Sequence, residues 1–229
     1  GKTEREWIDS LYEAAREEKP ELPELEEFRE MGVYTKKAEK PRIGCEAFRA
    51  DPEANPLKTP SGKIEIYSEA LDQYIQTHEF ADDDFVAPVP VYATEWYGVE
   101  TTTDEYPLVC SGFHYRGRLH SSWGFDEQLK AANPQEAWIN PVDAEERGIA
   151  QGDTIRVKNQ FGEIELLAKV TGRTTPGVVC ISQGAWHDAD MNGDRVDKGG
   201  SINTLTTLRP SPLAKGNPQH TNICQVTKA

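Results

Sequence analysis

The sequence predicts a mainly β fold, in which short strands close or nearly close into a barrel with small helices between them. From Tyr106 onward, short apolar runs alternate with tight-turn signals. The hydrophobic share of 37% is ordinary for a folded globular protein with a core. The six expected strands are YPLVCSG, EAWIN, TIRVKN, EIELLAKV, VVCISQ and NICQVTK, all within 106–228.

The amino-terminal part is expected to belong to a preceding domain. Residues 4–18 place Trp7, Ile8, Leu11 and Ala15 on one helical face, which predicts an amphipathic helix that ends before Pro20. The acid- and Pro-rich text KPELPELEEF that follows is typical of a linker. We therefore interpret residues 1–47 as a helix and linker from the preceding domain. The start at Gly rather than Met also favours a piece of a longer protein.

Residues 48–105 are interpreted as a connecting segment. The text over 41–62 is rich in Pro, Gly and Asn, which predicts an irregular surface path. Alternation in KIEIYS, residues 63–68, predicts a first strand with Ile64 and Ile66 on one face. A short helix over 69–76 and an irregular stretch to residue 104 are expected next, before a barrel domain over 106–229.

Two local motifs shape the expected barrel. Asn159-Gln160-Phe161-Gly162 lies between two alternating strands, so a hairpin is predicted, with Gly162 supplying a positive φ. In INPVDAEERGIAQGD, Asn140 is a suitable N-cap, and Pro141 suits the first helical position. Asp143, at the third helical position, is placed to accept a hydrogen bond from the backbone of the N-cap residue, and Gly148 is placed to end the helix.

Charge and cysteine content restrict the class of protein. The net charge of −14 argues against general binding of nucleic acids or anionic membranes, which need a cationic face. No window holds the 18 consecutive apolar residues that a membrane span requires. The four cysteines lack metal-ligand spacing and are interpreted as separate thiols; Cys110, Cys180 and Cys224 fall in apolar, strand-like runs and are expected to be buried, and the sequence selects no disulfide pairing.

A basic loop follows the first barrel strand. Residues 112–122 contain two Arg, two His and two Ser without any acid, and this composition favours an anion such as phosphate. An ordinary surface loop is the main alternative, and a metal at the two His is weaker because the guanidinium groups repel cations. The residues of interest are His114, Arg116, Arg118, His120, Ser121 and Ser122.

The carboxy-terminal tail, 198–229, is free of acid although the chain holds 39 acidic residues. Two Gly at its start permit close backbone approach, and its amides and hydroxyls offer neutral hydrogen-bonding edges suited to a heterocycle. A Pro-punctuated surface loop is the equal alternative. Trp186-His187-Asp188 precedes this tail without a nearby nucleophile, and a structural role is expected for it.

Together these segments resemble a known family. GGSINTLTTLRPSPLAKGNPQHTN, WHDADMNGDRVDKGG, WINPVDAEERGIAQGDTIRVKNQFGEI and HYRGRLHSS are similar to the carboxy-terminal domain of the dimethyl sulfoxide reductase family, with the best likeness to its catalytic A subunits. The likeness begins near Phe48. It implies a six-stranded double-psi β-barrel that closes over two molybdopterin guanine dinucleotides holding molybdenum.

The resemblance also implies roles for individual residues. The 114–122 loop would meet a pterin and its phosphates, Asn203 would contact the cofactor, and the helix start at Asn140 and Asp143 would lie beside a nucleotide. Asn217, Gln219 and His220 would lie near a pterin or guanine edge. The full set implied is His114, Arg116, Arg118, His120, Ser121, Ser122, Asn140, Asp143, Asn203, Asn217, Gln219 and His220, with no catalytic residue and no metal ligand among them.

As part of a full-length enzyme, the chain would serve oxygen-atom transfer from a sulfoxide or N-oxide. The iron–sulfur cluster and the molybdenum ligand would belong to upstream domains of the same polypeptide, so the 229 residues alone are expected to be inactive. An iron–sulfur subunit and a membrane anchor subunit would be partners, and the enzyme would be exported and membrane-associated through them. Alternatives are a polysulfide, thiosulfate, nitrate or formate relative, or a stand-alone nucleotide-binding or interaction barrel.

Overall fold

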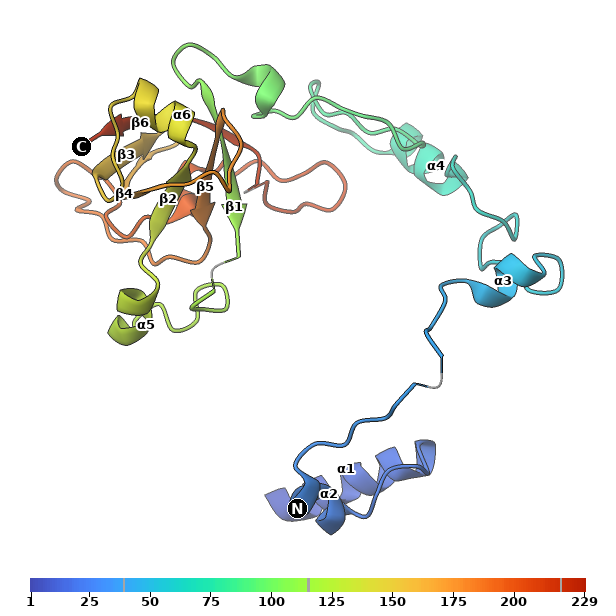
Figure 1. Cartoon of the computed structure of the whole chain (residues 1–229). Coiled ribbons are helices and arrows are strands. Elements are labelled where there is room, and N and C mark those ends of the chain that lie inside the picture. Colours follow the sequence, from blue (N-terminus) through green and yellow to red (C-terminus); the bar gives the residue numbers. More distant parts are fainter. Residues whose placement is uncertain (39, 115, 219) are drawn as a thin grey trace. The chain divides into compact units, whose positions relative to one another are not determined.

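The computed structural model describes residues 1–38, 40–114, 116–218 and 220–229. The chain divides into two compact units, Gly1–Glu65 and Ile66–Ala229, and each is described by itself. The first unit contains α1 (Glu4–Glu18), α2 (Leu25–Met31) and α3 (Glu46–Ala50) (Figure 1).

The predicted amphipathic helix is present as α1. Thr3 caps it, because the Thr3 side chain accepts from the backbone nitrogen of Glu6 while the Glu6 carboxylate accepts from that of Thr3. The linker expected over 19–28 is wrong in part, since α2 begins at Leu25. The ring of Phe28 packs 5.3 Å from that of Tyr12. This contact between α1 and α2 stabilises the second helix, which the local composition did not predict.

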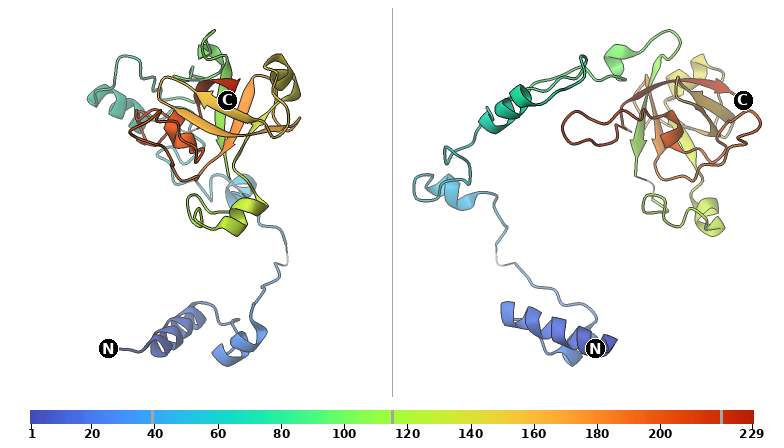
Figure 2. Two further views of the ribbon diagram at one scale, coloured as in Figure 1. Left: turned by 90° about the vertical axis from the view of Figure 1, so that its left-hand side faces the viewer. Right: turned by 180° about the vertical axis from the view of Figure 1, so that it is seen from behind.

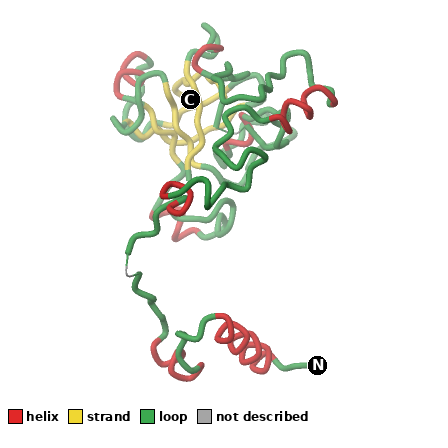
Figure 3. The backbone as a smooth tube through the Cα atoms, turned by 90° about the vertical axis from the view of Figure 1, so that its right-hand side faces the viewer, coloured by secondary structure: helices red, strands yellow, loops and turns green. Residues whose placement is uncertain are grey.

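The second unit begins with α4 (Glu69–Thr77) and the short helix η1 (Val99–Thr101). The helix predicted over 69–76 is therefore confirmed, but the strand predicted over 63–68 is wrong. Ile64 and Ile66 are 74% and 72% exposed, and this described segment forms no strand. Alternation stabilises a strand only when a neighbouring strand takes its backbone hydrogen bonds, and Figure 3 shows the strands gathered in the barrel instead.

Six strands close into a barrel in the order β1-β5-β2-β4-β3-β6 (Figures 1 and 2). Each of the six strands predicted from the sequence is present. The burial pattern along β4 alternates over most of its length, as expected for a strand with one face in a core. The strands are β1 (Leu108–Phe113), β2 (Glu136–Ile139), β3 (Thr154–Lys158), β4 (Glu163–Val170), β5 (Val178–Ser182) and β6 (Asn222–Lys228).

The pairing of the strands has an internal twofold pattern. β1 pairs in parallel with β5, and β4 pairs in parallel with β2. The remaining four contacts around the barrel are antiparallel. Exchanging β1, β2 and β3 for β4, β5 and β6, respectively, gives the same set of six pairs with the same directions. In each half, a strand belonging to the other half lies between two consecutive strands, so the connections cross as in a double-psi barrel, and the expected fold class is confirmed.

The barrel interior is filled with aliphatic side chains and two thiols. Ile139, Ile155 and Ile181 are fully buried, as are Cys110 on β1 and Cys224 on β6. All four cysteines are free. A hydrogen bond with Cys224, together with burial, raises the pKa of the Cys110 thiol well above its ordinary value, so this group stays protonated and packs as a small apolar residue.

The predicted hairpin joins β3 to β4, with Lys158 opposite Glu163. Its glycine serves a different purpose from the one expected, because Gly162 does not adopt a positive φ. A Cβ at Gly162 would lie 2.7 Å from the carbonyl oxygen of Thr204, so close approach of another backbone requires the glycine. Asn159 then holds the turn, since its Oδ1 accepts from the nitrogen of Phe161 at 3.0 Å.

The helix expected near residue 140 is α6 (Pro141–Glu146). Asn140 caps it by accepting from the nitrogen of Val142, as predicted. The Asp143 carboxylate does not bond to the backbone of the N-cap residue. It accepts from the backbone nitrogen of Gly177 at 2.8 Å instead, because the β4–β5 connection passes close to the helix. Two further short helices, α5 (Glu127–Ala132) and η2 (Ile202–Leu205), had no expected counterpart, and α3 and η1 lie where an irregular path was expected.

Candidate functional site

The basic loop that follows β1 is anchored by Arg118. Its Nη2 donates to Oε1 of Gln135 at 2.8 Å and to the carbonyl oxygen of Gln183 at 3.1 Å. Its Nε also donates to the Gln183 carbonyl, at 3.3 Å. The guanidinium thus spans from the segment before β2 to the segment after β5, and it fixes one side of the loop to the barrel.

Gln135 is the centre of this arrangement. Its Nε2 donates to the carbonyl oxygens of Ser182 and Gly200, at 2.8 and 2.9 Å. Its Oε1 accepts from Arg118 and also from Oγ of Ser182. One amide therefore joins the end of β5, the basic loop and the turn at Gly199 and Gly200 before η2, which we call the glycine turn. No sequence pattern indicates this role, since Gln135 stands alone between a proline and a strand.

A second contact brings the same loop against the segment after β5. Nε1 of Trp186 donates to the carbonyl oxygen of Ser121 at 2.8 Å. At Gly184, a Cβ would lie only 1.8 Å from the carbonyl oxygen of His120. The backbones approach so closely that glycine is required at this position.

The segment from Trp186 to Thr204 is organised around one buried carboxylate. Asp197 is fully buried, and its Oδ1 accepts from the backbone nitrogens of Asp188 and Gly199 at 2.8 and 2.9 Å. Its Oδ2 accepts from the nitrogen of Ser201 and from Oγ1 of Thr204, both at 2.9 Å. Four donors satisfy the two oxygens, so the carboxylate acts as a template that shapes the glycine turn.

Two adjoining clefts open onto these segments. We call the first, of about 700 Å³, the Lys198 cleft, and the second, of about 710 Å³, the Asn203 cleft. Ala185, Trp186 and His187 line both. The Lys198 cleft is further lined by Arg118, Lys130, Gln135, Glu165, Asp188 and Lys198, among others, and the Asn203 cleft by Ser121, Phe161, Ser201, Asn203 and Thr204.

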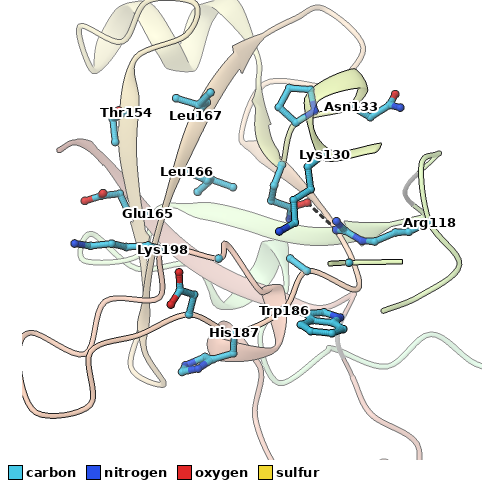
Figure 4. Close-up of a pocket in the computed structure, with 16 residues that line it drawn as sticks. Arg118, Lys130, Asn133, Thr154, Glu165, Leu166, Leu167, Trp186, His187 and Lys198 are labelled. Carbon is cyan, nitrogen blue, oxygen red and sulfur yellow. Dashed lines mark hydrogen bonds between the residues drawn. The ribbon is translucent and has the colours of Figure 1, made fainter. Parts of the chain in front are cut away.

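The two clefts differ in chemistry. Arg118, Lys130 and Lys198 bring three cations to the Lys198 cleft, against the two carboxylates of Glu165 and Asp188. Figure 4 shows Lys198 and Glu165 on one side of it and Arg118 on the other. The Asn203 cleft has neutral amide and hydroxyl edges instead. The first suits phosphate oxygens, and the second suits the polar rim of a heterocycle.

The remaining residues of the basic loop lie at the same end of β1. His114 and Arg116 are exposed and line a cavity of about 370 Å³ with Lys169 and Arg173. The rings of His114 and His120 stand edge to face, 5.9 Å apart. Ser121 lines the Asn203 cleft, whereas Ser122, which is exposed, lines neither cleft.

From the tail, Asn203 and His220 come to this region. Asn203 is exposed in the cleft that bears its name, and Nδ1 of His220 lies 2.9 Å from the carbonyl oxygen of Gly112 in β1. Asn217 is exposed and lines neither cleft. Gln219 lies outside the described residues.

Asn140 and Asp143 are placed elsewhere. Gln135 precedes β2 whereas Asn140 follows it, so the two lie at opposite ends of that strand; Figure 1 shows α5 and α6 at opposite ends of the barrel. Nδ2 of Asn140 donates to the carbonyl oxygen of Thr174 at 2.6 Å, and Asp143 holds the β4–β5 connection. Both side chains are buried and serve the fold.

Within the described ranges, no group of three or more His, Cys, Asp and Glu side chains is arranged to hold a metal ion. In the same ranges, none of the helices has the length and apolar character needed to cross a membrane.

Comparison with known proteins finds a family match over the region that contains both clefts. Residues 108–223, about half of the chain, match the family model "Molydopterin dinucleotide binding domain". The chain is 52% identical to dimethyl sulfoxide reductase DmsA of Escherichia coli (strain K12) and 51% identical to that of Haemophilus influenzae. It is 34% identical to a trimethylamine-N-oxide reductase of Haemophilus influenzae.

These alignments cover the whole chain but only 28 to 29% of each relative. The chain therefore spans less than a third of the length of these relatives. Among solved structures, acetylene hydratase from Pelobacter acetylenicus matches with a TM-score of 0.60 at 21% identity, over 78% of this chain and 25% of that one. At that identity the likeness concerns the fold alone.

Proposed function

The chain belongs to the molybdopterin dinucleotide-binding domain family, and from this premise we propose that its two clefts hold such a dinucleotide. The observation that carries the proposal is the position of the clefts. Every residue that lines the Lys198 cleft and the Asn203 cleft falls within the matched residues 108–223. A dinucleotide has both phosphates and planar heterocycles, and the two clefts offer the matching chemistry side by side.

The residues present fit this cofactor by their donor set. Arg118, Lys130 and Lys198 provide cationic donors for phosphate oxygens, while Asn203 and Ser201 provide neutral edges for a ring. Of the residues implied by the resemblance, Arg118, Ser121 and Asn203 line the two clefts. The other members of the basic loop, beside the clefts, are His114, Arg116, His120 and Ser122. Asn217, Gln219 and His220 remain assigned to a pterin or guanine edge by that resemblance, and Asn140 and Asp143 to a nucleotide by the resemblance alone.

We further propose that the chain is the carboxy-terminal domain of a larger molybdenum enzyme with two molybdopterin guanine dinucleotides. The relatives support a dimethyl sulfoxide or N-oxide reductase, because identity to sulfoxide reductases is 51 to 52% and identity to an N-oxide reductase is 34%. Catalytic metal ligation, an iron–sulfur cluster, an electron-transfer subunit, a membrane anchor subunit and export would all belong to the longer protein and its complex.

When bound, molybdenum supplies oxygen-atom transfer, and this chain supplies the surroundings of the cofactor. Arg118 and Gln135 hold the basic loop against the barrel, so the loop keeps its shape without the ligand. The buried Asp197 carboxylate presents the turn that carries Asn203. Such preformed groups orient a ligand at lower entropic cost than mobile ones. The 229 residues alone are expected to reduce no sulfoxide.

The test is the molybdenum and guanine nucleotide content of the full-length protein purified from its own host. Wild type is compared with Asn203→Ala, in the neutral cleft, and with Arg116→Glu, which reverses an exposed charge of the basic loop. We expect both contents to be present in wild type and to fall together in both variants. A wild type without molybdenum would overturn the proposal, and normal content in both variants would overturn the assignment of the site.

A further inference from the structure

We propose that the exposed indole ring of Trp186 is the stacking surface for a planar heterocycle of the bound dinucleotide. This inference rests on the proposed function and deepens it, since it assigns a contact to a residue that sequence analysis had expected to be structural. The ligand class is a flat, nitrogen-rich aromatic ring. The pterin and the guanine of the cofactor share this chemistry, and the experiment below distinguishes them.

The orientation of the ring is fixed by its neighbours. Nε1 donates to the carbonyl oxygen of Ser121 at 2.8 Å, which satisfies the only polar atom of the indole. A Cβ at Gly124 would lie 2.6 Å from both Cδ1 and Nε1 of the ring, so the backbone of that buried glycine packs directly against it. The ring of Phe125 lies 6.2 Å away in a tilted arrangement.

Despite these contacts, Trp186 is 54% exposed. Its exposed surface lies where the two clefts meet, because the residue lines both of them. In Figure 4 the ring stands at one wall of the Lys198 cleft, below Arg118. Beyond it, the Asn203 cleft places the amide of Asn203 and the hydroxyl of Ser201 in the same hollow.

This combination favours a ring-shaped ligand over solvent. A large apolar ring held in one orientation at the meeting point of two clefts gains free energy when a flat partner covers it. Stacking on an aromatic side chain suits heterocycles, which have a π face and hydrogen-bonding edges. Trp186 lines both the cleft with neutral groups for those edges and the cleft with cations for phosphates, as a dinucleotide requires.

The experiment uses full-length protein prepared in three forms: without cofactor, with molybdopterin lacking the guanine nucleotide, and with the complete dinucleotide. The contribution of Trp186 to the fluorescence is the difference between wild type and Trp186→Phe in each form. Any polypeptide that covers Trp186 in the longer protein is present in all three forms, so it cancels from the comparison. Stacking on a pterin or guanine is expected to quench this contribution.

Quenching that appears with molybdopterin alone assigns the pterin, and quenching that needs the dinucleotide assigns the guanine. Trp186→Phe and Trp186→Leu form the matched pair for content, since both lose the bond to Ser121 but only Phe keeps an aromatic face. We expect the Leu variant to contain less molybdenum and guanine nucleotide than the Phe variant, because loss of stacking weakens cofactor binding by roughly fivefold or more.

Equal contents in the two variants, with an unchanged Trp186 fluorescence in all three forms, would overturn the stacking role. If wild type still contains molybdenum and guanine in that case, the proposed function stands and only this inference fails. If wild type contains neither, the proposed function itself fails.

Discussion

The carboxylate of Asp197 accepts a hydrogen bond from Oγ1 of Thr204 at 2.9 Å, and this bond joins the last acidic residue of the chain to the acid-free tail. The tail lacks acid from Lys198 to the carboxy terminus, yet the turn at its start is built on a buried carboxylate. The negative charge is surrounded by donors of the protein itself. Under the proposed function, the tail thus exposes no carboxylate to the phosphates of the cofactor.

Replacement of Asp197 is expected to destabilise the barrel. Asp197→Ala would leave four buried or part-buried donors without their acceptor, so the free energy of unfolding should fall by roughly 3 kcal/mol or more. Asp197→Asn keeps one acceptor oxygen and should cost less. Urea denaturation of the 229-residue chain measures both. Asp153→Ala is the control, because Asp153 bonds to Ala150 and Lys228 near the surface and should matter less. An equal loss at both positions would contradict the template role.

Gly199→Ala is expected to be costly for steric reasons alone. The new Cβ would lie 1.9 Å from the carbonyl oxygen of Trp186, and backbone atoms cannot yield as a flexible side chain can. We expect the unfolding free energy to fall by about 1–3 kcal/mol. Gly172→Ala is the matched control, since nothing lies within 4 Å of its Cβ position. Thermal unfolding followed by circular dichroism compares the two, and similar midpoints would show that the 186–199 turn relaxes without strain.

The strands were predictable because each is a short apolar run bounded by turn signals, and the two that flank the hairpin also alternate. The same pattern over 63–68 failed, since Ile64 and Ile66 have no partner strand and remain exposed. A local sequence specifies the faces of a strand but not its neighbour. The hairpin shows a similar limit. Its position was predictable from Asn159 and Gly162, but the reason for the glycine lies in the approach of Thr204.

Residues of the candidate site could be proposed from the sequence where the composition is unusual, but not where their contacts are distant in the chain. The basic loop and the segment with Asn203 contain no acid in an otherwise acidic chain, so their possible ligands could be inferred from composition. Gln135, Trp186 and Asp197 have no local signal. Gln135 bonds to residues 47 and 65 positions away, and Trp186 to one 65 positions away. Only the closed barrel brings these segments together.

Arg209 is expected to control the titration of Asp83. Its guanidinium hydrogen-bonds Asp83 at 2.7 Å, bonds Asp84, and stacks 3.8 Å above the ring of Trp96. The hydrogen bond to Arg209 lowers the pKa of Asp83 below its ordinary value of 3.8. A carboxyl with a depressed folded pKa stabilises the fold above the unfolded value, and this contribution is lost as pH falls below 3.8 through the folded pKa.

NMR titration of the Asp83 carboxyl in wild type and in Arg209→Gln measures this effect. In the variant, the pKa of Asp83 should return toward 3.8. The fluorescence of Trp96, which the guanidinium covers in wild type, should change with pH over this acidic range in wild type but not in the variant. The same Asp83 titration in both proteins would mean that the ion pair is absent in solution. Added salt should raise the wild-type pKa, because an exposed pair is screened.

The two arginines of the basic loop are expected to differ in what they stabilise. Arg118 donates to Gln135 and Gln183, whereas Arg116 is exposed. Arg118→Ala would leave part-buried acceptors without a charged donor, so the unfolding free energy of the 229-residue chain should fall by roughly 1–3 kcal/mol. Arg116→Ala, as an exposed substitution, should change it by less than about 0.5 kcal/mol.

In full-length protein, both changes should lower the molybdenum and guanine nucleotide content, but for different reasons. Arg118→Ala acts through the shape of the loop, so a ligand-independent loss of stability accompanies it. Arg116→Ala removes only a cation that faces solvent, so its effect should weaken as salt is added. Urea denaturation and metal analysis of the same two variants separate these causes. If Arg118→Ala left stability unchanged, the bonds to Gln135 and Gln183 would not hold the loop, and the two arginines would share one role as phosphate ligands.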